Sequence, residues 1–401
     1  MRKALLAVTC ALTLVLAGCG ASGGQSASSK SKTVKIGVVA NLTGGFSPYD
    51  LPAYQGLKMA VKDMNKQGGI GGKSIELVTF DQKSKPALSQ TGARQVIEQG
   101  ASVVVAPCDF DYGAPAALAA QAAEKPAMST CAGDAAFGVK GIGPYAYSMA
   151  VPNNWEGAAF AEFMFEEQKW SRAYFLVDTT ISYTKGWGNA AMDRFKEMGG
   201  DVVGHDTMQN SDPSVAAQIS RFKSLKPQPD VFVVDSFAPG VTAAVKQIRD
   251  AGITVPIAGA AGMDGDFWTK GIPNLGDVYH SAQCGYVAGP GTGETDDQWA
   301  LAQKYEQEYG EKPINGQFLC GYAVIQAYAE AMKVAGTTTD GVKINEALQN
   351  LNDVPSAAGT FSFKPDNHAP QRDVSIAKFE NGKENFVTNW SPKSVPPAPV
   401  G

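Results

Sequence analysis

The stretch VKIGVVANLTGGFSPYDLPAYQGLKMAVKDMNKQGGIGGKSIELVTF, residues 34–80, decides the fold because it joins two apolar runs through a loop and a helical pattern. The first run, Val34–Ala40, is nearly continuous and suits a parallel strand that is buried on both faces. Apolar residues from Leu57 to Met64 recur at helical spacing, and the glycine pair after Gln67 ends this helix. The second run, Ile75–Phe80, predicts the next strand, so the stretch is typical of a β–α–β unit.

The same alternation continues along the chain and predicts an α/β fold with open parallel sheets. A second series begins after Ala150, and two series of similar size predict two similar lobes. Further strands are expected at Ser102–Ala106, Ala127–Ser129, Ala173–Val177, Asp201–Asp206, Asp230–Val234 and Val255–Ile257. Helices are expected at Ala87–Gln99, Ala114–Glu124, Trp155–Gln168, Lys185–Met198, Ser214–Ser224, Pro239–Ala251, Asp297–Tyr309 and Gly316–Val334.

The composition is that of a soluble globular protein of about two domains. The chain has 401 residues, of which 44% are hydrophobic and 18% charged, and a domain takes roughly 100–200 residues. Lys and Arg number 34 against 39 Asp and Glu, and this mild acidity argues against nucleic acid as a partner. Three isolated histidines leave little material for a metal or catalytic centre. We therefore expect a monomer that is not an enzyme and that has no cofactor and no metal.

The N-terminus indicates export. Residues 1–18 combine basic residues, a short apolar stretch and small residues, as in a secretory signal peptide. The sequence LAGC at positions 16–19 resembles the lipobox of bacterial lipoproteins, in which Cys19 is acylated and becomes the first mature residue. The alternative is an ordinary signal with an incidental cysteine. We expect residues 19–32 to form a lipidated cysteine and a flexible Ser/Gly-rich tether that anchors an extracytoplasmic protein to the cell membrane.

The loops after the expected strands are the place to look for a ligand. In open α/β sheets, ligands bind beyond the carboxyl ends of the strands. These loops are rich in glycine, aspartate and aromatic residues, as a small-molecule site should be. They are Asn41–Asp50, Pro107–Gly113, Thr130–Asp134, Asp178–Lys185, Asp235–Gly240 and Gly259–Asp266.

Besides the opening stretch, four segments match one protein family in their order and spacing. They are SVVVAPCDFDYGAP (102–115), TISYTKGWGNAAMDRFKEMGGDVVGHDT (180–207), PDVFVVDSFAPGVTAAVKQIRDAGITVPI (229–257) and GYAVIQAYAEAMKVAG (321–336). Together they resemble the solute-binding proteins of ABC importers that are related to the Leu/Ile/Val-binding protein, the type I periplasmic binding proteins. The resemblance covers nearly all of the chain from Val34 to about Asn389.

The resemblance implies two Rossmann-like lobes that are joined by three hinge crossovers near Val151, Cys284 and Phe361. A small-molecule ligand would bind between the lobes, and closure would present it to the permease subunits of an ABC importer. The implied N-terminal lobe consists of residues 33–151 and 287–360, and the C-terminal lobe of residues 152–286 and 361–390. The Pro-rich residues 391–401 are expected to form a loose tail.

The resemblance also implies the residues of the pocket. Tyr49 and Tyr183 match aromatic ligand contacts, Tyr286 near a crossover is a further match, and Phe237 falls where the family often has a tyrosine. The implied ligand-binding set is Phe46, Tyr49, Asp109, Phe110, Asp111, Cys131, Gly133, Tyr183, Asp235, Phe237, Asp264 and Tyr286. Alternatively, the tyrosines pack at the bases of loops, and the aspartates at 109, 111 and 235 cap helices.

At the positions where the family binds the carboxylate and the ammonium group of an amino acid, this chain has different residues. The loop that should hold a ligand carboxylate carries Asp109 and Asp111, which would repel a carboxylate in the cleft, and Gly133 replaces an expected threonine. The position of the ammonium-binding acid holds Ala261, with Asp264 three residues on. An unpaired buried charge costs several kcal/mol. We therefore predict that the ligand is not leucine, isoleucine or valine but a small organic solute, aromatic or amide-like.

Four cysteines remain after the signal and Cys19, and four cysteines allow three pairings or buried free thiols. Cys108 and Cys131 follow neighbouring strands of the first lobe. Cys284 lies at a crossover, and Cys320 lies on a helix that resembles one returning to that lobe. We predict the disulfides Cys108–Cys131 and Cys284–Cys320.

Three classes of function follow from the sequence. The leading one is a lipid-anchored binding protein that feeds an ABC importer. A receptor of the same fold that signals to a membrane sensor is the second, and an extracellular enzyme, for which no catalytic constellation is visible, is the third.

The first prediction tests the anchor. Cys19→Ser removes the thiol that would be acylated, so this variant should leave the membrane fraction for the medium or remain unprocessed. Fractionation of cells followed by immunoblotting measures this. A variant that stays with the membranes and is processed like the unchanged chain would contradict the lipoprotein assignment.

Overall fold

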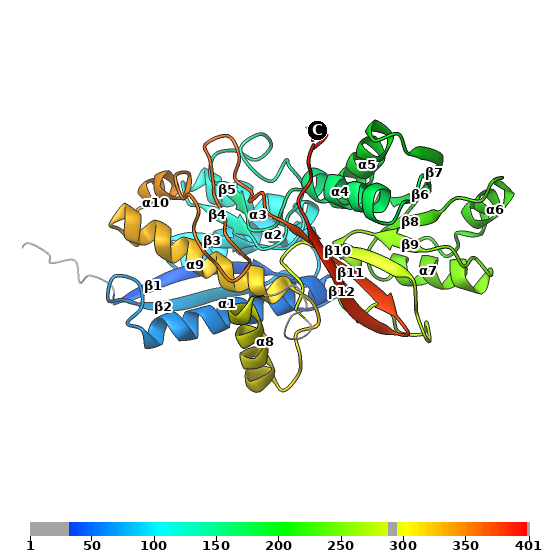
Figure 1. Ribbon diagram of the computed structural model, residues 1–401. Helices are drawn as coiled ribbons and strands as arrows, with labels where there is room; N and C mark the ends of the chain where they lie inside the picture. The colour runs from blue at the N-terminus through cyan, green and yellow to red at the C-terminus, as the bar shows by residue number, and fades with distance from the viewer. Residues whose placement is uncertain (1–31, 288–294, 399–401) are drawn as a thin grey trace, which may run out of the picture. The chain divides into compact units, whose positions relative to one another are not determined.

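The computed structural model describes residues 32–287 and 295–398 (Figure 1). The expected signal peptide and Cys19 lie outside the described residues. In the described part of the chain, no helix combines the length and the apolar character that a membrane span needs.

The first sheet has five parallel strands in the order β2-β1-β3-β4-β5. The central strands β1 and β3 are rich in β-branched residues and are almost completely buried, which explains why they appear in the sequence as continuous apolar runs. They are β1 (Thr33–Ala40), β2 (Ser74–Asp81), β3 (Val103–Ala106), β4 (Ala127–Ser129) and β5 (Ala146–Ser148).

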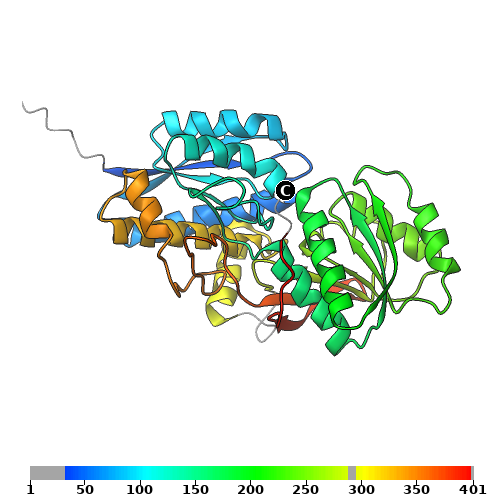
Figure 2. The same cartoon turned by 90° about the horizontal axis from the view of Figure 1, so that it is seen from above.

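Helices cover both faces of this sheet (Figure 2). One face packs against α1, α9 and α10, with α8 beside them, and the other face packs against α2 and α3. The bounds are α1 (Ser47–Lys66), η1 (Pro86–Leu88), α2 (Ser89–Glu98), α3 (Phe110–Ala122), α8 (Asp296–Tyr309), α9 (Gln317–Ala335) and α10 (Gly341–Leu348).

Two glycines allow α1 and α9 to touch. A Cβ atom on Gly56 of α1 would lie 2.0 Å from the carbonyl oxygen of Phe318, and one on Gly321 of α9 would lie 1.9 Å from that of Ala53. Both distances are shorter than any contact between a Cβ atom and an oxygen, so only glycine fits at these positions. The close approach brings the third segment of the chain into the core of the first lobe.

The second sheet repeats the same order and then extends it. Strands β7-β6-β8-β9-β10 are parallel, and β11 and β12 add an antiparallel hairpin next to β10. The predicted α/β class with two lobes is confirmed, but the second sheet is mixed rather than all parallel. Its strands are β6 (Arg172–Asp178), β7 (Asp201–Met208), β8 (Val231–Asp235), β9 (Ile257–Gly259), β10 (Val278–Ala282), β11 (Val374–Glu380) and β12 (Lys383–Trp390).

The second sheet is also covered on both faces. Aromatic residues of α4, the π-helical turn η2 and α5 fill one face, and α6 and α7 pack on the other. The bounds are α4 (Asn153–Glu162), η2 (Phe163–Glu167), α5 (Ser182–Glu197), α6 (Ala216–Ser224), α7 (Gly240–Asp250) and the short 3-10 turn η3 (Ala261–Met263).

The structure differs from the sequence predictions in two parts of the second sheet. The strand expected at Val255–Ile257 is wrong in position, since β9 begins only at Ile257. The carbonyl of Val255 instead accepts a hydrogen bond of 2.8 Å from Nη1 of Arg249, which keeps it out of the sheet. The hairpin of β11 and β12 was not expected, because β12 is an edge strand with few buried residues.

The chain passes between the two sheets at three places. Two of them lie near Val151, between β5 and α4, and near Cys284, directly after β10. The third was expected near Phe361 and is wrong, since Phe361 belongs to the core of the first lobe and His368 stacks on Tyr147 at 4.1 Å. The crossing lies nearer Arg372, whose carbonyl accepts a 2.8 Å hydrogen bond from Trp155 Nε1 of α4.

The Pro-rich segment after β12 is not a loose tail as far as Ala398, the last residue that the structure describes. The backbone N–H groups of Lys393 and Ser394 donate to the carboxylate of Glu162, at 2.9 and 3.3 Å. The side-chain amide of Asn154 donates to the carbonyl of Pro396 at 2.9 Å. Proline cannot continue a helix or sheet ladder, but its carbonyl and its neighbours' N–H groups still bind the end of the chain to α4.

The structure pairs the cysteines as predicted. Cys108 and Cys131 form one disulfide with their Cα atoms 4.7 Å apart, and Cys284 and Cys320 form the other with a Cα separation of 5.5 Å. The first joins the loops after β3 and β4. The second joins the segment after β10 to α9, so it links the second crossing to the first lobe.

The second prediction concerns Glu162, the last residue of α4. Its carboxylate is fully buried and also pairs with Arg194 at 2.7 Å. Glu162→Ala removes the buried partner of that guanidinium and leaves the N–H groups of Lys393 and Ser394 without their acceptor, so it should lower the free energy of unfolding by about 3 kcal/mol. Urea denaturation measures this.

Glu197→Ala is the matched control. Glu197 pairs with the same Arg194 at 3.2 Å, but its side chain is 50% exposed. An exposed ion pair contributes roughly 0–1 kcal/mol, so this variant should differ little from the unchanged chain. Equal losses for the two variants would show that the contacts of Glu162 do not hold the C-terminal segment.

Candidate functional site

The carboxyl edges of the two sheets supply the loops of one enclosed site. The strand order of each sheet reverses beside its first strand, between β1 and β3 in the first lobe and between β6 and β8 in the second. Ligands of open α/β sheets bind at such switch points. Here the loops enclose a cavity of about 30 Å³, which is room for about two water molecules. Its lining residues are Phe46, Tyr49, Cys108, Asp109, Cys131, Ile181, Tyr183, Phe237, Ala261, Gly262, Gln283 and Gln317.

Aromatic rings form the apolar wall of this cavity. The ring of Phe46 lies 5.1 Å from that of Tyr49, 5.6 Å from that of Phe237 and 4.1 Å from that of Tyr112, on which it stacks. Tyr49 also meets Phe267 edge to face at 5.5 Å. Because Phe46 and Tyr49 follow β1 while Phe237 and Phe267 follow strands of the second sheet, these contacts join the two lobes.

Hydrogen bonds between the lobes accompany the ring contacts. Tyr49 Oη donates to the carbonyl of Gly262 at 3.0 Å, and Oη accepts the N–H of Ala238 at 3.3 Å. The N–H of Ser182, at the start of α5, donates to the carboxylate of Asp111 at 2.7 Å. The structure is therefore a closed form in which the two lobes contact each other directly.

Asp50 holds the first lobe's loops in place, and sequence reasoning did not select it. Its carboxylate is buried and accepts the N–H of Asn41 at 2.6 Å and that of Cys108 at 2.7 Å, so it bridges the loops after β1 and β3. Burial raises the pKa of Asp50 to about 7, although both N–H groups act in the opposite direction.

Glu156 has the same role in the second lobe and was also missed. Its fully buried carboxylate accepts the hydroxyls of Tyr183 at 2.8 Å and Ser281 at 2.5 Å, and the N–H of Ala261 at 3.2 Å. Burial raises its pKa to about 7. Position 261, where the family pattern has an ammonium-binding acid, holds alanine. The structure instead brings the carboxylate of Glu156, from α4, to the N–H of Ala261.

Asp109 is the acidic residue that lines the cavity. It begins α3, and its Oδ1 accepts the N–H of Asp111 at 2.8 Å. Its Oδ2 is buried and has no hydrogen-bond partner, and its φ angle is +77°. Burial and the nearby charge of Asp111 raise its pKa well above the usual range. A left-handed backbone conformation at a non-glycine residue is costly, and such residues cluster at functional sites.

The predicted pocket residues fall into three groups. Those that line the cavity are Phe46, Tyr49, Asp109, Cys131, Tyr183 and Phe237. Gly133 lies behind Tyr183, since a Cβ atom there would be 3.2 Å from its ring, and Asp111 binds Ser182. Asp235 is fully buried beside Gly188 of α5, and burial raises its pKa well above the usual range.

Three further predicted residues lie elsewhere. Phe110 borders an outer groove with Leu118 and Lys185, and Tyr286 borders another with Trp299. Asp264 points toward His280 and Glu384 rather than into the cavity. These three residues were assigned to the pocket because their spacing along the sequence matches the family pattern. Spacing does not determine the direction in which a side chain points. The cavity residues that the predicted set lacks include Ile181, Gln283 and Gln317.

Comparison with known proteins decides the family. Residues 33–384 match the family described as periplasmic binding protein. The chain belongs to this family.

Relatives of known name agree with this periplasmic binding protein assignment. The chain is 24% identical over 353 residues to the Leu/Ile/Val-binding protein BraC3 of Rhizobium johnstonii, a match that covers 87% of this chain and 92% of the relative. It is similar in structure to LivJ of Streptococcus pneumoniae in complex with isoleucine (TM-score 0.78, 23% identity, 88% of this chain and 99% of that one). It is also similar to a solute-binding protein of R. palustris in complex with benzoate (TM-score 0.75, 19% identity, 91% and 98%).

The third prediction concerns the pH dependence of stability. The pKa of Glu156 is about 7 in the folded chain against an ordinary value of 4.5. Between these values the folded chain holds a proton that the unfolded chain releases, so stability falls as the pH rises from about 4.5 to about 7. Glu156→Gln removes this titrating group. The free energy of unfolding of the variant should therefore decrease over this pH range by about 3 kcal/mol less than that of the unchanged chain.

Urea denaturation at pH 5 and pH 8 measures the difference. Glu167→Gln, at an exposed position in the adjoining turn η2, is the control and should keep the pH dependence of the unchanged chain. An unaltered pH dependence in Glu156→Gln would show that this carboxylate does not titrate as its burial requires.

Proposed function

We propose that this chain is an extracytoplasmic solute-binding protein that captures a small organic molecule between its lobes and delivers it to an ABC importer. The observation that carries the proposal is the cavity at both switch points, with aromatic walls and a buried, unpartnered carboxylate oxygen. Membership of the periplasmic binding proteins supports it, and so do relatives in complex with isoleucine and benzoate.

Capture requires the lobes to separate. A cavity of about 30 Å³ is too small for an organic solute, so Phe46 and Tyr49 must part from Phe237 and Phe267 to admit one. The connections near Val151, Cys284 and Arg372 are the places where the chain can bend. Closure over a solute then restores the contacts between lobes and removes the ligand from water.

The chemistry of the walls favours a solute that donates hydrogen bonds. Asp109 is the acidic residue of the lining, and its Oδ2 has no hydrogen-bond partner. An amide, amine or ammonium group would supply the missing donor, whereas a carboxylate would meet a like charge. The aromatic rings suit a planar or apolar body. This supports an aromatic or amide-like solute rather than leucine, isoleucine or valine.

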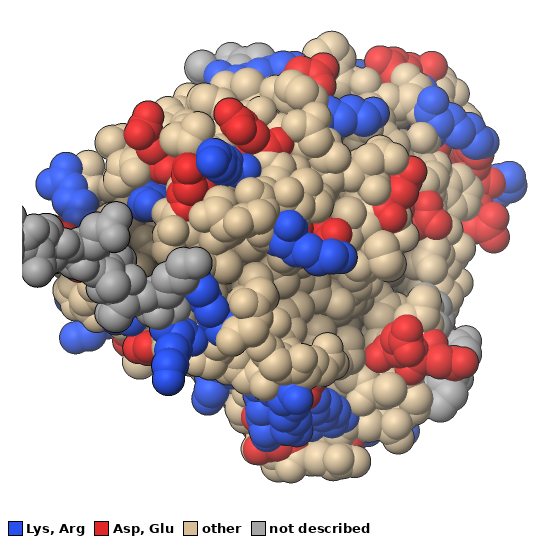
Figure 3. Space-filling model, turned by 90° about the vertical axis from the view of Figure 1, so that its left-hand side faces the viewer, with Lys and Arg blue, Asp and Glu red and all other residues tan. Residues whose placement is uncertain are grey.

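Anchoring and delivery complete the proposal. The signal sequence and LAGC at positions 16–19 support attachment of the chain to the membrane through lipid on Cys19. One face of the molecule carries Lys and Arg interspersed with Asp and Glu (Figure 3). A surface of mixed sign does not steer a highly charged polymer such as nucleic acid to that face.

Identification of the natural solute tests the proposal. Protein purified from its native host is denatured, and the released small molecules are identified by mass spectrometry. We expect one small organic compound in stoichiometric amount, which rebinds on calorimetric titration, and no tight binding of the three branched-chain amino acids. Chemical conversion of the compound by the protein would show an enzyme instead.

The fourth prediction uses the compound so identified. A donor group of the solute favours the ionised form of Asp109. Asp109→Asn removes this carboxylate, and a hydrogen bond to a charged group is worth roughly 1.5–3 kcal/mol. The dissociation constant should therefore rise about 10- to 100-fold. Asp193→Asn, at an exposed position of α5, is the control and should bind as the unchanged chain does. Tighter binding by Asp109→Asn would indicate an anionic ligand and contradict the proposed chemistry.

A further inference from the structure

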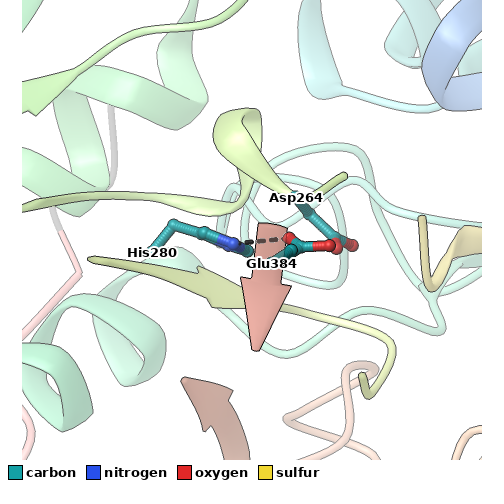
Figure 4. A group of neighbouring side chains, drawn as sticks. All are labelled: Asp264, His280 and Glu384. Atoms are coloured by element: carbon teal, nitrogen blue, oxygen red, sulfur yellow. Dashed lines mark ion pairs between the residues drawn. The ribbon is translucent and has the colours of Figure 1, made fainter. Parts of the chain in front are cut away.

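A histidine and two carboxylates converge beside the second sheet, away from the solute cavity. Figure 4 shows Asp264, His280 and Glu384 pointing toward one another from the loop after η3, from β10 and from β12. One ligand atom of each residue lies within 4.8 Å of the others. No metal site was expected here, because the three histidines are isolated along the chain. Strand pairing through β11 brings Glu384 to His280 across about a hundred residues of sequence.

The imidazole of His280 is oriented for coordination. Its Nδ1 lies 3.0 Å from the carbonyl of Ser281, a contact that makes Nδ1 the protonated nitrogen and leaves Nε2 with a free lone pair in the neutral ring. Nε2 is fully buried and lies 2.6 Å from Oε1 of Glu384, with which it forms an ion pair when the ring is protonated, and a metal ion would take the place of that proton. Metal-binding histidines are held in this way, by a hydrogen bond from the other ring nitrogen to a carbonyl.

Backbone groups also orient the two carboxylates. The N–H of Gly316 donates to Oδ2 of Asp264 at 3.1 Å, and the N–H of Gly265 donates to Oε1 of Glu384 at 3.0 Å. Among the described residues, neither carboxylate forms an ion pair with lysine or arginine. Two carboxylates and a lone pair facing one another in a buried place repel unless a positive charge lies among them.

We propose that Asp264, His280 and Glu384 form a binding site for a divalent transition-metal ion, with zinc as the ion to test first. Imidazole together with carboxylate suits zinc and its neighbours, whereas magnesium and calcium prefer oxygen ligands alone. Three protein ligands leave a fourth position for water. The side chain of Glu384 is 17% exposed and borders a groove of about 450 Å³, which offers the ion a path from solvent.

The ion would steady one wall of the solute cavity. Asp264 directly follows η3, whose Ala261 and Gly262 line the cavity, and its carboxylate binds Gly316 at the start of α9 in the first lobe. Coordination would tie this loop to β10 and β12 at one end and keep its contact with the first lobe at the other. The proposal does not depend on which solute the cavity accepts.

Zinc titration tests the proposal. The full chain is stripped with EDTA, dialysed and titrated with zinc chloride in a calorimeter, with magnesium chloride as a second titrant. We expect saturable binding of one zinc ion per chain and no measurable heat from magnesium. Glu384→Gln should weaken zinc binding at least tenfold. Glu380→Gln, at the exposed end of β11 in the same hairpin, should bind zinc as the unchanged chain does.

A second measurement uses the unchanged chain and so does not rely on a variant that folds. Cobalt(II) replaces zinc, and its visible absorption reports coordination by the protein. We expect a cobalt spectrum that saturates at one equivalent and disappears when zinc is added. No saturable uptake of either ion would overturn the proposal and assign the positive charge to a proton on His280. Equal zinc affinity in Glu384→Gln would overturn it as well.

Discussion

Carboxylates buried where two parallel sheets present their carboxyl ends to each other are the constraint on which this molecule depends. An acid in such a place is stable only if donors surround it or a proton neutralises it. Asp50 meets this requirement with the N–H groups of two loops, and Glu156 meets it with two hydroxyls and one N–H. Each carboxylate thereby fixes loops that come from distant parts of the chain. The shape of the cavity follows from those loops.

The sequence was sufficient for the framework because buried parallel strands leave continuous apolar runs. The interpretation of Val34–Ala40 as a strand agrees with β1, and the segment that follows contributes Phe46 and Tyr49 to the cavity lining. The hairpin of β11 and β12 escaped prediction for the opposite reason. Strand β12, KENFVTNW, pairs on one side only and exposes much of its surface, so its residues form no apolar run.

The roles of Asp50 and Glu156 could not be predicted from the sequence for a different reason. Asp50 and Glu156 both lie in the first turn of a helix, where an acid is expected simply because it favours the helix dipole. Their real partners are 27 to 125 residues away for Glu156 and 58 residues away at Cys108 for Asp50. The local sequence pattern does not reveal contacts between residues that are so far apart in the chain. The same limit explains why Asp264 was assigned to the cavity, since spacing located the residue but not the direction of its side chain.

The order of the strands has a consequence for folding kinetics. The first sheet is complete at β5, but the second cannot be finished until the chain has passed through α8, α9 and α10 and returned as β11. Contacts between residues so far apart require a large loop to close first, which slows folding. The edge of β10 therefore stays unpaired until β11 has formed. The contacts of Lys393 and Ser394 with Glu162 lie still further along the chain, so they too require residues from the end of the sequence.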